Sequence, residues 1–228
     1  MSRSLRKFIT VPSKISCKSI VMLFALVVGF LSVLTASEMP KQRSTIIPQP
    51  IEVKHRTGVF TLNNKTKIVF SLSNNELRMT AEYLGTLMRK ATGFELPVVK
   101  SGKMPKSNYI FLHLVRPNKL GKEGYKLEVE YGKIQLLAHQ PAGLFYALQT
   151  LLQLLPPEIY GSQVRNDIEW RIPCISVYDT PRFSWRGMHL DACRHFFPKE
   201  FIKKYIDVLA LYKMNTFHWH LTEDQGWR

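Results

Sequence analysis

The sequence is poor in cysteine, and it contains neither an internal repeat nor a low-complexity tract. Cysteine occurs three times in 228 residues, without a CxxC pair or a paired Cys/His spacing. Such a composition excludes a disulfide framework and offers no zinc motif. Cys17 falls near the N-terminus, and we expect the other two, Cys174 and Cys193, to be buried thiols.

Acidic residues are also scarce, because 17 Asp and Glu stand against 32 Lys and Arg, a net charge of +15. Five of the basic residues occur before residue 19, and the rest of the chain keeps a net charge of +10. The sequence has no dense run of Lys and Arg with interleaved aromatic residues. The basic residues therefore predict a solvated surface and no nucleic-acid partner.

The first 37 residues contain no acidic residue at all. Basic residues come first, an apolar run follows over 20–34, and the small residues Thr35, Ala36 and Ser37 end the segment. This layout predicts a secretory signal peptide over 1–37 and an exported protein, in the periplasm or outside the cell. We expect no stable membrane insertion after cleavage. The alternative is an uncleaved membrane anchor, although the apolar run is short for a bilayer span.

The next part of the chain has the patterns of a mixed fold, with alternating apolar residues in some segments and helical spacing in others. The predicted elements are strands over 65–72 and 109–115, a hairpin over 124–138, and helices over 75–92 and 142–155. The first helix has its apolar positions at Leu77, Ala81, Leu84 and Met88. Together they predict an α+β domain over 44–165 in which no residue pattern points to catalysis.

Two further segments follow this domain. Residues 166–180, interrupted by Pro173, are expected to form an irregular bridge. From residue 181 the pattern changes to a strand over 184–192, a helix that begins at Pro198, and a strand over 215–221. A strand, a helix and a strand in this spacing predict a βαβ unit with two parallel strands.

Polar residues follow each of the two strands. They are Asp191, Arg194 and His195 after the first strand, and Glu223, Asp224 and Gln225 after the second. Because parallel strands end at the same edge of a sheet, these two sets are expected to face each other. An arginine among carboxylates is suited to holding the hydroxyl groups of a sugar. The alternative is a structural ion pair between Arg194 and an acid.

His218 and His220 are separated by one residue, so their side chains point to the same face of the predicted strand. An H-x-H pair is a possible start of a metal site, which would make the protein a metal-dependent barrel hydrolase. A closed site needs further ligands, and the interpretation that we favour places both histidines in a polar interior.

Several segments closely resemble the β-N-acetylhexosaminidases of glycoside hydrolase family 20. They are "RGMHLDACRHF", "YKMNTFHWHL" and "EDQGWR" in the last part of the chain, and "IIPQP" and "GLFYALQTLLQLLP" before it. The resemblance implies that residues 181–228 begin a (β/α)8 TIM barrel that is incomplete within this sequence. It implies hydrolysis of terminal β-linked N-acetylglucosamine or N-acetylgalactosamine with retention of configuration, the substrate's acetamido oxygen acting as nucleophile. It implies no metal and no organic cofactor.

The resemblance also assigns roles to residues. It implies that Arg194 binds the ring hydroxyls of the sugar, that Glu223, where the family often has Asp, supports the acid/base glutamate through a histidine, and that Asp224 is structural. The family's catalytic Asp-Glu pair lies on the fourth barrel strand, so we expect no catalytic residue within 1–228 and no activity from this chain alone. The implied partners are glycans that end in N-acetylhexosamine. The alternative function is a non-catalytic carbohydrate-binding or structural module.

Overall fold

A computed structural model describes residues 45–71, 74–116, 120–224 and 226–227. The expected leader over 1–37 and the site candidate Gln225 lie outside the described residues. In these ranges, no helix has both the length and the apolar character needed to cross a membrane.

The largest element of the fold is a seven-stranded mixed sheet. Its strands are β1 (Glu52–Thr61), β2 (Lys67–Phe70), β3 (Val98–Lys100), β4 (Tyr109–Leu114), β5 (Tyr125–Glu130), β6 (Lys133–Ala138) and β7 (Arg171–Asp179). They lie in the order β1-β7-β5-β6-β4-β2-β3. On one side of β6, the strands β1, β7, β5 and β6 pair antiparallel. On the other side, the strands β6, β4, β2 and β3 pair parallel. The predicted hairpin over 124–138 is confirmed as β5 and β6.

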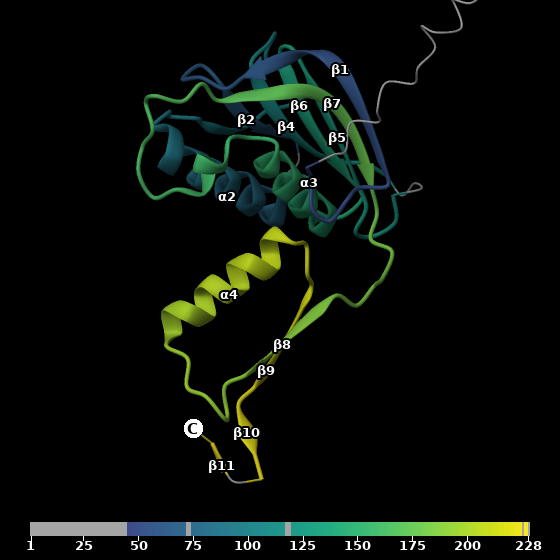
Figure 1. The fold of residues 1–228 in the computed structure, drawn as a ribbon. Helices are drawn as coiled ribbons and strands as arrows, with labels where there is room; N and C mark the ends of the chain where they lie inside the picture. Colours follow the sequence, from purple (N-terminus) through teal and green to yellow (C-terminus); the bar gives the residue numbers. More distant parts are fainter. Residues whose placement is uncertain (1–44, 72–73, 117–119, 225, 228) are drawn as a thin grey trace, which may run out of the picture. The chain divides into compact units, whose positions relative to one another are not determined.

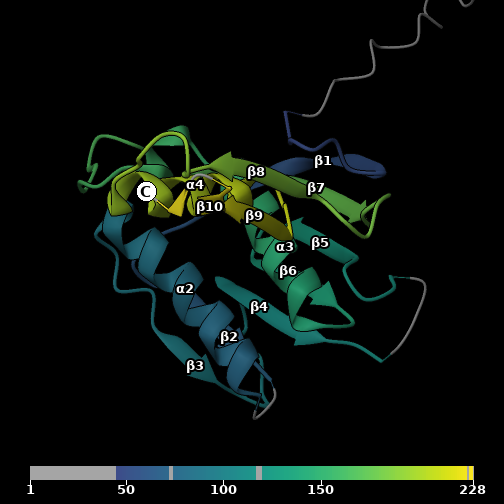
Figure 2. The ribbon, with the colours of Figure 1, turned by 90° about the horizontal axis from the view of Figure 1, so that it is seen from below.

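Helices α2 (Asn75–Thr92) and α3 (Pro141–Gln153) pack together on one face of this sheet (Figures 1 and 2). The side chain of Asn74 accepts a hydrogen bond from the Leu77 amide and so caps the start of α2. The helix ends at Gly93, whose φ of 70° is in the left-handed region that glycine adopts without strain. The four apolar positions predicted for α2 are all fully buried in the core between the helices and the sheet. Both predicted helices are therefore confirmed.

The expectation of an irregular bridge over 166–180 is wrong for Arg171–Asp179, which form β7 between β1 and β5. Pro173 suggested a break because proline cannot donate a ladder hydrogen bond. The structure places Pro173 beyond the stretch of β7 that pairs with β5, and opposite Val59, next to a register shift in β1. A bulge in the neighbouring strand makes room for a residue without an N–H, so the strand continues through the proline.

After β7 the chain forms β8 (Gly187–Asp191), α4 (Lys199–Leu211) and β9 (Thr216–His220), followed by the short strands β10 (Thr222–Glu223) and β11 (Gly226–Trp227). Strands β8 and β9 pair in parallel as a two-stranded sheet, which confirms the predicted βαβ unit (Figure 1). One side of β9 packs aromatic rings against α4, where the ring centroids of Tyr205 and Phe217 are 5.4 Å apart.

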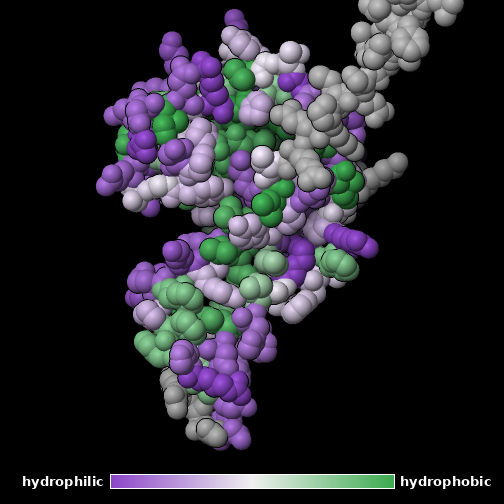
Figure 3. Space-filling model, viewed as in Figure 1, coloured by the Kyte–Doolittle hydropathy of each residue, from purple (hydrophilic) through white to green (hydrophobic). Residues whose placement is uncertain are grey.

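The apolar side of α4 is covered less completely than its pattern suggested. Among its apolar residues, Ile202 and Leu209 are buried, whereas Phe201 and Ile206 remain 40% and 47% exposed. Hydrophobic and polar residues are therefore mixed over the surface of the βαβ unit in Figure 3.

Cys174 and Cys193 are both buried thiols, as predicted. Cys174 lies in β7 and Cys193 in the loop after β8. Burial raises the pKa of the Cys174 thiol, so the neutral form predominates.

Candidate functional site

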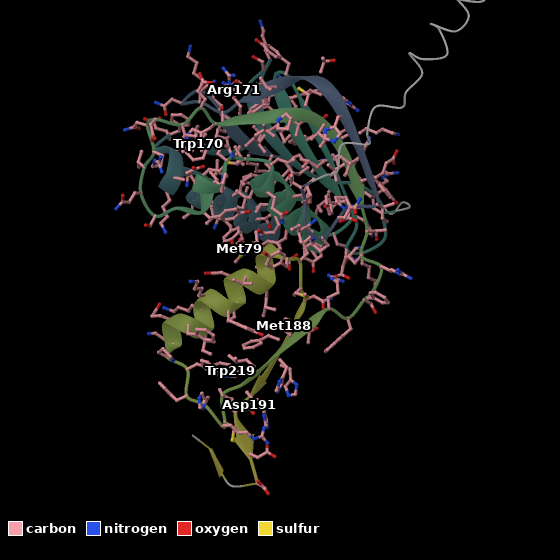
Figure 4. The ribbon with its side chains drawn as sticks, viewed as in Figure 1. Met79, Trp170, Arg171, Met188, Asp191 and Trp219 are labelled. Carbon is pink, nitrogen blue, oxygen red and sulfur yellow. The ribbon has the colours of Figure 1, made fainter. Side chains whose placement is uncertain are left out.

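The candidate site lies where β8 and β9 end side by side. In the parallel register of these strands, Asp191, the last residue of β8, is the partner of His220, the last residue of β9. Figure 4 shows Asp191 at this end of the two strands, with Met188 and Trp219 nearer their middle. The polar residues that follow the strands therefore start from neighbouring backbone positions.

Asp191 shapes the loop that follows β8. Its Oδ1 accepts hydrogen bonds from the backbone amides of Cys193 and Arg194, each at 3.1 Å. Its Oδ2 lies 2.5 Å from Nη1 of Arg194. The hydrogen bond from the Arg194 amide, and then the one from the guanidinium, lower the pKa of Asp191 to about 2. The carboxylate is therefore ionised at neutral pH and holds both the backbone and the side chain of Arg194.

Arg194 joins the two strand ends. Besides Asp191, its guanidinium contacts Glu223 of β10, with Nη2 2.9 Å from Oε2. The prediction that the two polar sets face each other is thus confirmed for Arg194 and Glu223. The hydrogen bond to Asp191 and the charge of Glu223 raise the pKa of Arg194, so the guanidinium stays charged. Its side chain is 64% exposed, and a guanidinium carries five N–H donors, so a ligand can still approach it.

His220 is a member of this cluster that the sequence interpretation assigned to interior packing. Its Nε2 lies 3.1 Å from Oε2 of Glu223, and its Nδ1 lies 3.6 Å from Oδ1 of Asp191. The imidazole therefore bridges the two carboxylates that hold Arg194. A signal for this placement was present in the sequence, because His220 ends the second strand just as Asp191 ends the first, and parallel pairing brings such ends together.

The remaining candidates stand outside the cluster. His195 is exposed, and its Nδ1 lies 3.0 Å from the carbonyl oxygen of Arg194. Asp224 is exposed in the turn after β10.

His218 shares a face of the sheet with two other histidines. Its ring centroid is 4.6 Å from that of His189 and 6.2 Å from that of His220. His218 is exposed, so it is not buried as the polar-interior interpretation expected. Within the described ranges, no group of three or more His, Cys, Asp or Glu side chains has the geometry to hold a metal ion. The H-x-H pair therefore gives the metal-site hypothesis no geometric support there.

The cluster as a whole can present a charged, bidentate donor from a fixed position. Two carboxylates and one imidazole orient the guanidinium of Arg194, and the fork of an arginine can bind two neighbouring oxygens at once. The cluster uses both of its carboxylates, Asp191 and Glu223, to contact Arg194 and His220. It is therefore suited to binding and orienting a ligand.

Two family models match the chain in consecutive parts. Residues 43–180 match the model described as "Glycosyl hydrolase family 20, domain 2", and residues 183–228 match "Glycosyl hydrolase family 20, catalytic domain". The first match includes β7, and the second contains the βαβ unit with the cluster around Arg194.

Individual relatives agree with this assignment. A β-hexosaminidase of Porphyromonas gingivalis is 38% identical over 185 residues, covering 80% of this chain and 23% of that protein. The solved structure of a family 20 β-N-acetylhexosaminidase from Streptomyces coelicolor superposes with a TM-score of 0.75 and 36% identity, covering 84% of this chain and 37% of that one. A β-N-acetylhexosaminidase of Bacteroides fragilis gives 0.64 and 29%, covering 80% and 34%. The chain thus spans about a quarter to a third of the length of these relatives.

Proposed function

The chain belongs to glycoside hydrolase family 20, and from this premise we propose that it contributes to an exo-β-N-acetylhexosaminidase. The substrate would be a glycan that ends in β-linked N-acetylglucosamine or N-acetylgalactosamine. Support comes from the relatives, which are named β-hexosaminidases, and from the cluster at the ends of β8 and β9. In this proposal β8, α4 and β9 are the first unit of an eight-stranded barrel.

The observation that carries the proposal is the fixed guanidinium of Arg194. Asp191 and Glu223 hold it at 2.5 and 2.9 Å, from two different strand ends. We propose that its remaining N–H donors bind neighbouring ring hydroxyls of the terminal sugar. Charged donors form stronger hydrogen bonds than neutral ones, and prior fixation reduces the entropy that is lost on binding.

The proposed chemistry is substrate-assisted. The acetamido oxygen of the sugar attacks the anomeric carbon, the leaving oxygen takes a proton from a glutamic acid, and water then opens the resulting oxazolinium ring with retention. This reaction requires an adjacent Asp-Glu pair, which the family resemblance places on the fourth strand of the barrel. Residues 181–228 would bind and orient the sugar, with Glu223 supporting the site and Asp224 structural. An exported location would give such an enzyme access to extracellular or periplasmic glycans.

A chimaeric enzyme tests this role directly. Residues 45–228 would replace the matching part of the Streptomyces coelicolor β-N-acetylhexosaminidase, and hydrolysis of a chromogenic N-acetylglucosaminide would be measured. We expect the chimaera to be active and Arg194→Ala to lower kcat/KM at least ~100-fold, because hydrogen bonds to charged groups contribute about 1.5–3 kcal/mol each.

The control is Lys203→Ala, which removes an exposed cation on α4 that pairs with Glu200. It is expected to leave kcat/KM unchanged. A folded Arg194→Ala chimaera with full activity would contradict the proposed role. Binding of N-acetylglucosamine by a folded chimaera that never turns over substrate would favour a non-catalytic sugar-binding module.

A further inference from the structure

A second polar cluster lies away from the sugar site, where the βαβ unit meets the preceding domain. We call its members the docking residues: Glu123, Tyr125, Tyr146 and Asp179 from the domain over 45–180, and Arg186 and Lys213 from the βαβ unit. The domain supplies the two acids and the βαβ unit supplies the two cations. In Figure 1 the C-terminal end of α4, just before Lys213, lies next to the helices that cover the sheet.

Arg186 and Glu123 form a bidentate ion pair across this junction. Nη2 lies 2.8 Å from Oε1, and Nη1 lies 3.1 Å from Oε2. The hydroxyl of Tyr146 donates to Oε1 of Glu123 at 3.0 Å and accepts from Nη2 of Arg186 at 2.9 Å. The two charged side chains are only 15% and 24% exposed. The hydrogen bond from Arg186 lowers the pKa of Glu123, so this carboxylate is ionised.

The same arginine contacts the segments that precede both parallel strands. Its Nε donates to the carbonyl of Lys213 at 2.9 Å, in the turn after α4, and its Nη1 donates to the carbonyl of Phe183 at 2.7 Å, before β8. Asn215 at the start of β9 completes the link, because it accepts from the Arg186 amide at 3.0 Å and donates to Glu123 at 3.3 Å. Glu123 is therefore connected to the starts of both parallel strands.

Lys213 is a buried cation in the same junction. Its side chain is 6% exposed, and its Nζ lies 2.8 Å from the hydroxyl of Tyr125 and 3.6 Å from Oδ2 of Asp179. Tyr125 and Asp179 are register partners on β5 and β7, and the Tyr125 hydroxyl is also 2.6 Å from Thr150 of α3. The backbone of Lys213 has a φ of 60°, in the left-handed region where residues other than glycine are strained.

This junction is not explained by apolar packing. Between α3 and α4 the structure has an open apolar cavity of about 390 Å³, lined among others by Phe145 and Leu209. Replacing buried ion pairs by packed apolar residues is often neutral or stabilising, but removing one partner of such a pair is costly. The ion pair of Lys213 is therefore weak evidence for stability, but its partners on β5 and β7 can be reached only in one arrangement of the two parts.

We propose that the domain over 45–180 is a docking template for the βαβ unit, with Arg186 and Lys213 as positioning residues. Arg186 sits immediately before β8, and Asp191 and Arg194 stand at the other end of that strand and in the loop that follows. Through the rigid strand, the contact with Glu123 sets where the guanidinium of Arg194 lies. This inference does not depend on the proposed hydrolase activity, because the contacts lie within the chain itself.

Hydrogen exchange on the 228-residue chain tests the proposal. In Glu123→Gln, which removes the charge but keeps the size, we expect backbone amides of β8 and β9 to exchange at least ~10 times faster, while α2 amides keep their protection. Glu123→Asp, which keeps the charge, is expected to restore part of that protection. The matched control is Glu130→Gln, because Glu130 is 41% exposed and pairs with Lys133 away from the junction.

A double-mutant cycle adds a second measurement. Once Arg186→Met has removed the guanidinium, adding Glu123→Gln should cause no further acceleration of exchange, because the interaction is already lost. In the chimaera described above, Glu123→Gln is expected to raise KM several-fold and leave the thermal transition of the domain over 45–180 unchanged. Unchanged exchange in β8 and β9, or an equal increase in α2, would overturn the proposal. An inactive chimaera with the expected exchange pattern would count against the proposed hydrolase function alone.

Discussion

Nη2 of Arg194 lies 2.9 Å from Oε2 of Glu223, so the loop after β8 and the short strand β10 meet in an ion pair. Glu223 also contacts His220, and its side chain is 34% exposed. A pair this accessible contributes little to stability, typically less than about 1 kcal/mol. The ion pair should therefore affect ligand binding more than stability, because it orients the guanidinium of Arg194.

Replacing Glu223 separates these two contributions. In the chimaeric enzyme, Glu223→Gln is expected to lower kcat/KM about 10-fold, because Arg194 loses one of its two charged partners. Glu223→Asp keeps the charge and is expected to lose less. Thermal unfolding should change by no more than about 1 kcal/mol in either variant. A loss of stability that matches the loss of activity would instead indicate a structural ion pair.

Asp191 should remain ionised at a lower pH than an ordinary aspartate. The amide and guanidinium of Arg194 lower its pKa to about 2 from the ordinary value of 3.8. Because the folded-state pKa is depressed, the stabilisation is fully present above the unfolded-state pKa and is lost as the pH falls through about 2. A ¹³C chemical-shift titration of the Asp191 carboxyl should show this midpoint. In Arg194→Ala the midpoint should rise, and a wild-type midpoint near 3.8 would contradict the observed contacts.

Sequence patterns within one segment predicted the elements that depend on that segment alone. The helix over Asn75–Thr92 was predicted from its periodic apolar face, and the structure shows a cap at Asn74 and an end at Gly93 within the same segment. The facing of Arg194 and Glu223 was also predictable, because parallel strands end at one edge of a sheet. Strand β7 was missed because the tolerance for Pro173 depends on a bulge in β1, far away in sequence.

The contacts that the sequence did not reveal join distant segments. Nothing near Arg186 identifies Glu123 as its partner, and nothing near Lys213 identifies Asp179. Both cations look like ordinary surface charges in a basic chain until the fold buries them. The partners of His220 were hidden for a related reason, since an H-x-H pattern does not show which carboxylates the rings will meet.

The close approach of α3 to the hairpin makes Gly143 sensitive to substitution. A Cβ at this position would lie 2.9 Å from the Ala138 side chain and would clash with the carbonyl oxygen of Gly124. Gly143→Ala is therefore expected to lower the free energy of unfolding by about 1–3 kcal/mol. Gly102→Ala is the control, because a Cβ there meets no described atom within 4 Å. Equal denaturation midpoints for the two variants would contradict this packing.

A polypeptide limited to residues 1–228 is expected to show no hydrolysis of a chromogenic N-acetylglucosaminide. Among the described residues, the parallel sheet that follows the first domain has two strands, β8 and β9, and an eight-stranded barrel needs all of its strands to close around a substrate. The cluster around Arg194 offers binding without an acid/base pair. The measurement is turnover by the purified polypeptide against a buffer blank. Turnover that disappears in Arg194→Ala would contradict this expectation.

Lys213 should make stability depend on pH in the alkaline range. Burial lowers its pKa from 10.5 to about 8, against the opposing effect of Asp179. Between these two values the unfolded chain binds more protons than the folded chain, so the free energy of unfolding rises with pH across this window. One pKa unit corresponds to about 1.4 kcal/mol, which sets an upper limit of roughly 3 kcal/mol for the increase.

Denaturant unfolding of wild type and Lys213→Met at about pH 7.5 and about pH 10 measures this effect. Subtracting the two free energies of unfolding at each pH cancels the contribution of all other titrating groups, which the two proteins share. We expect wild type to gain stability relative to Lys213→Met as the pH rises, because the buried cation is neutralised and no longer opposes folding. Lys203→Met is the control, since Lys203 is 60% exposed on α4, the helix that precedes Lys213. If the difference in the free energy of unfolding between wild type and Lys213→Met stays constant with pH, Lys213 titrates as it does in water. The docking junction would then have to be open to solvent.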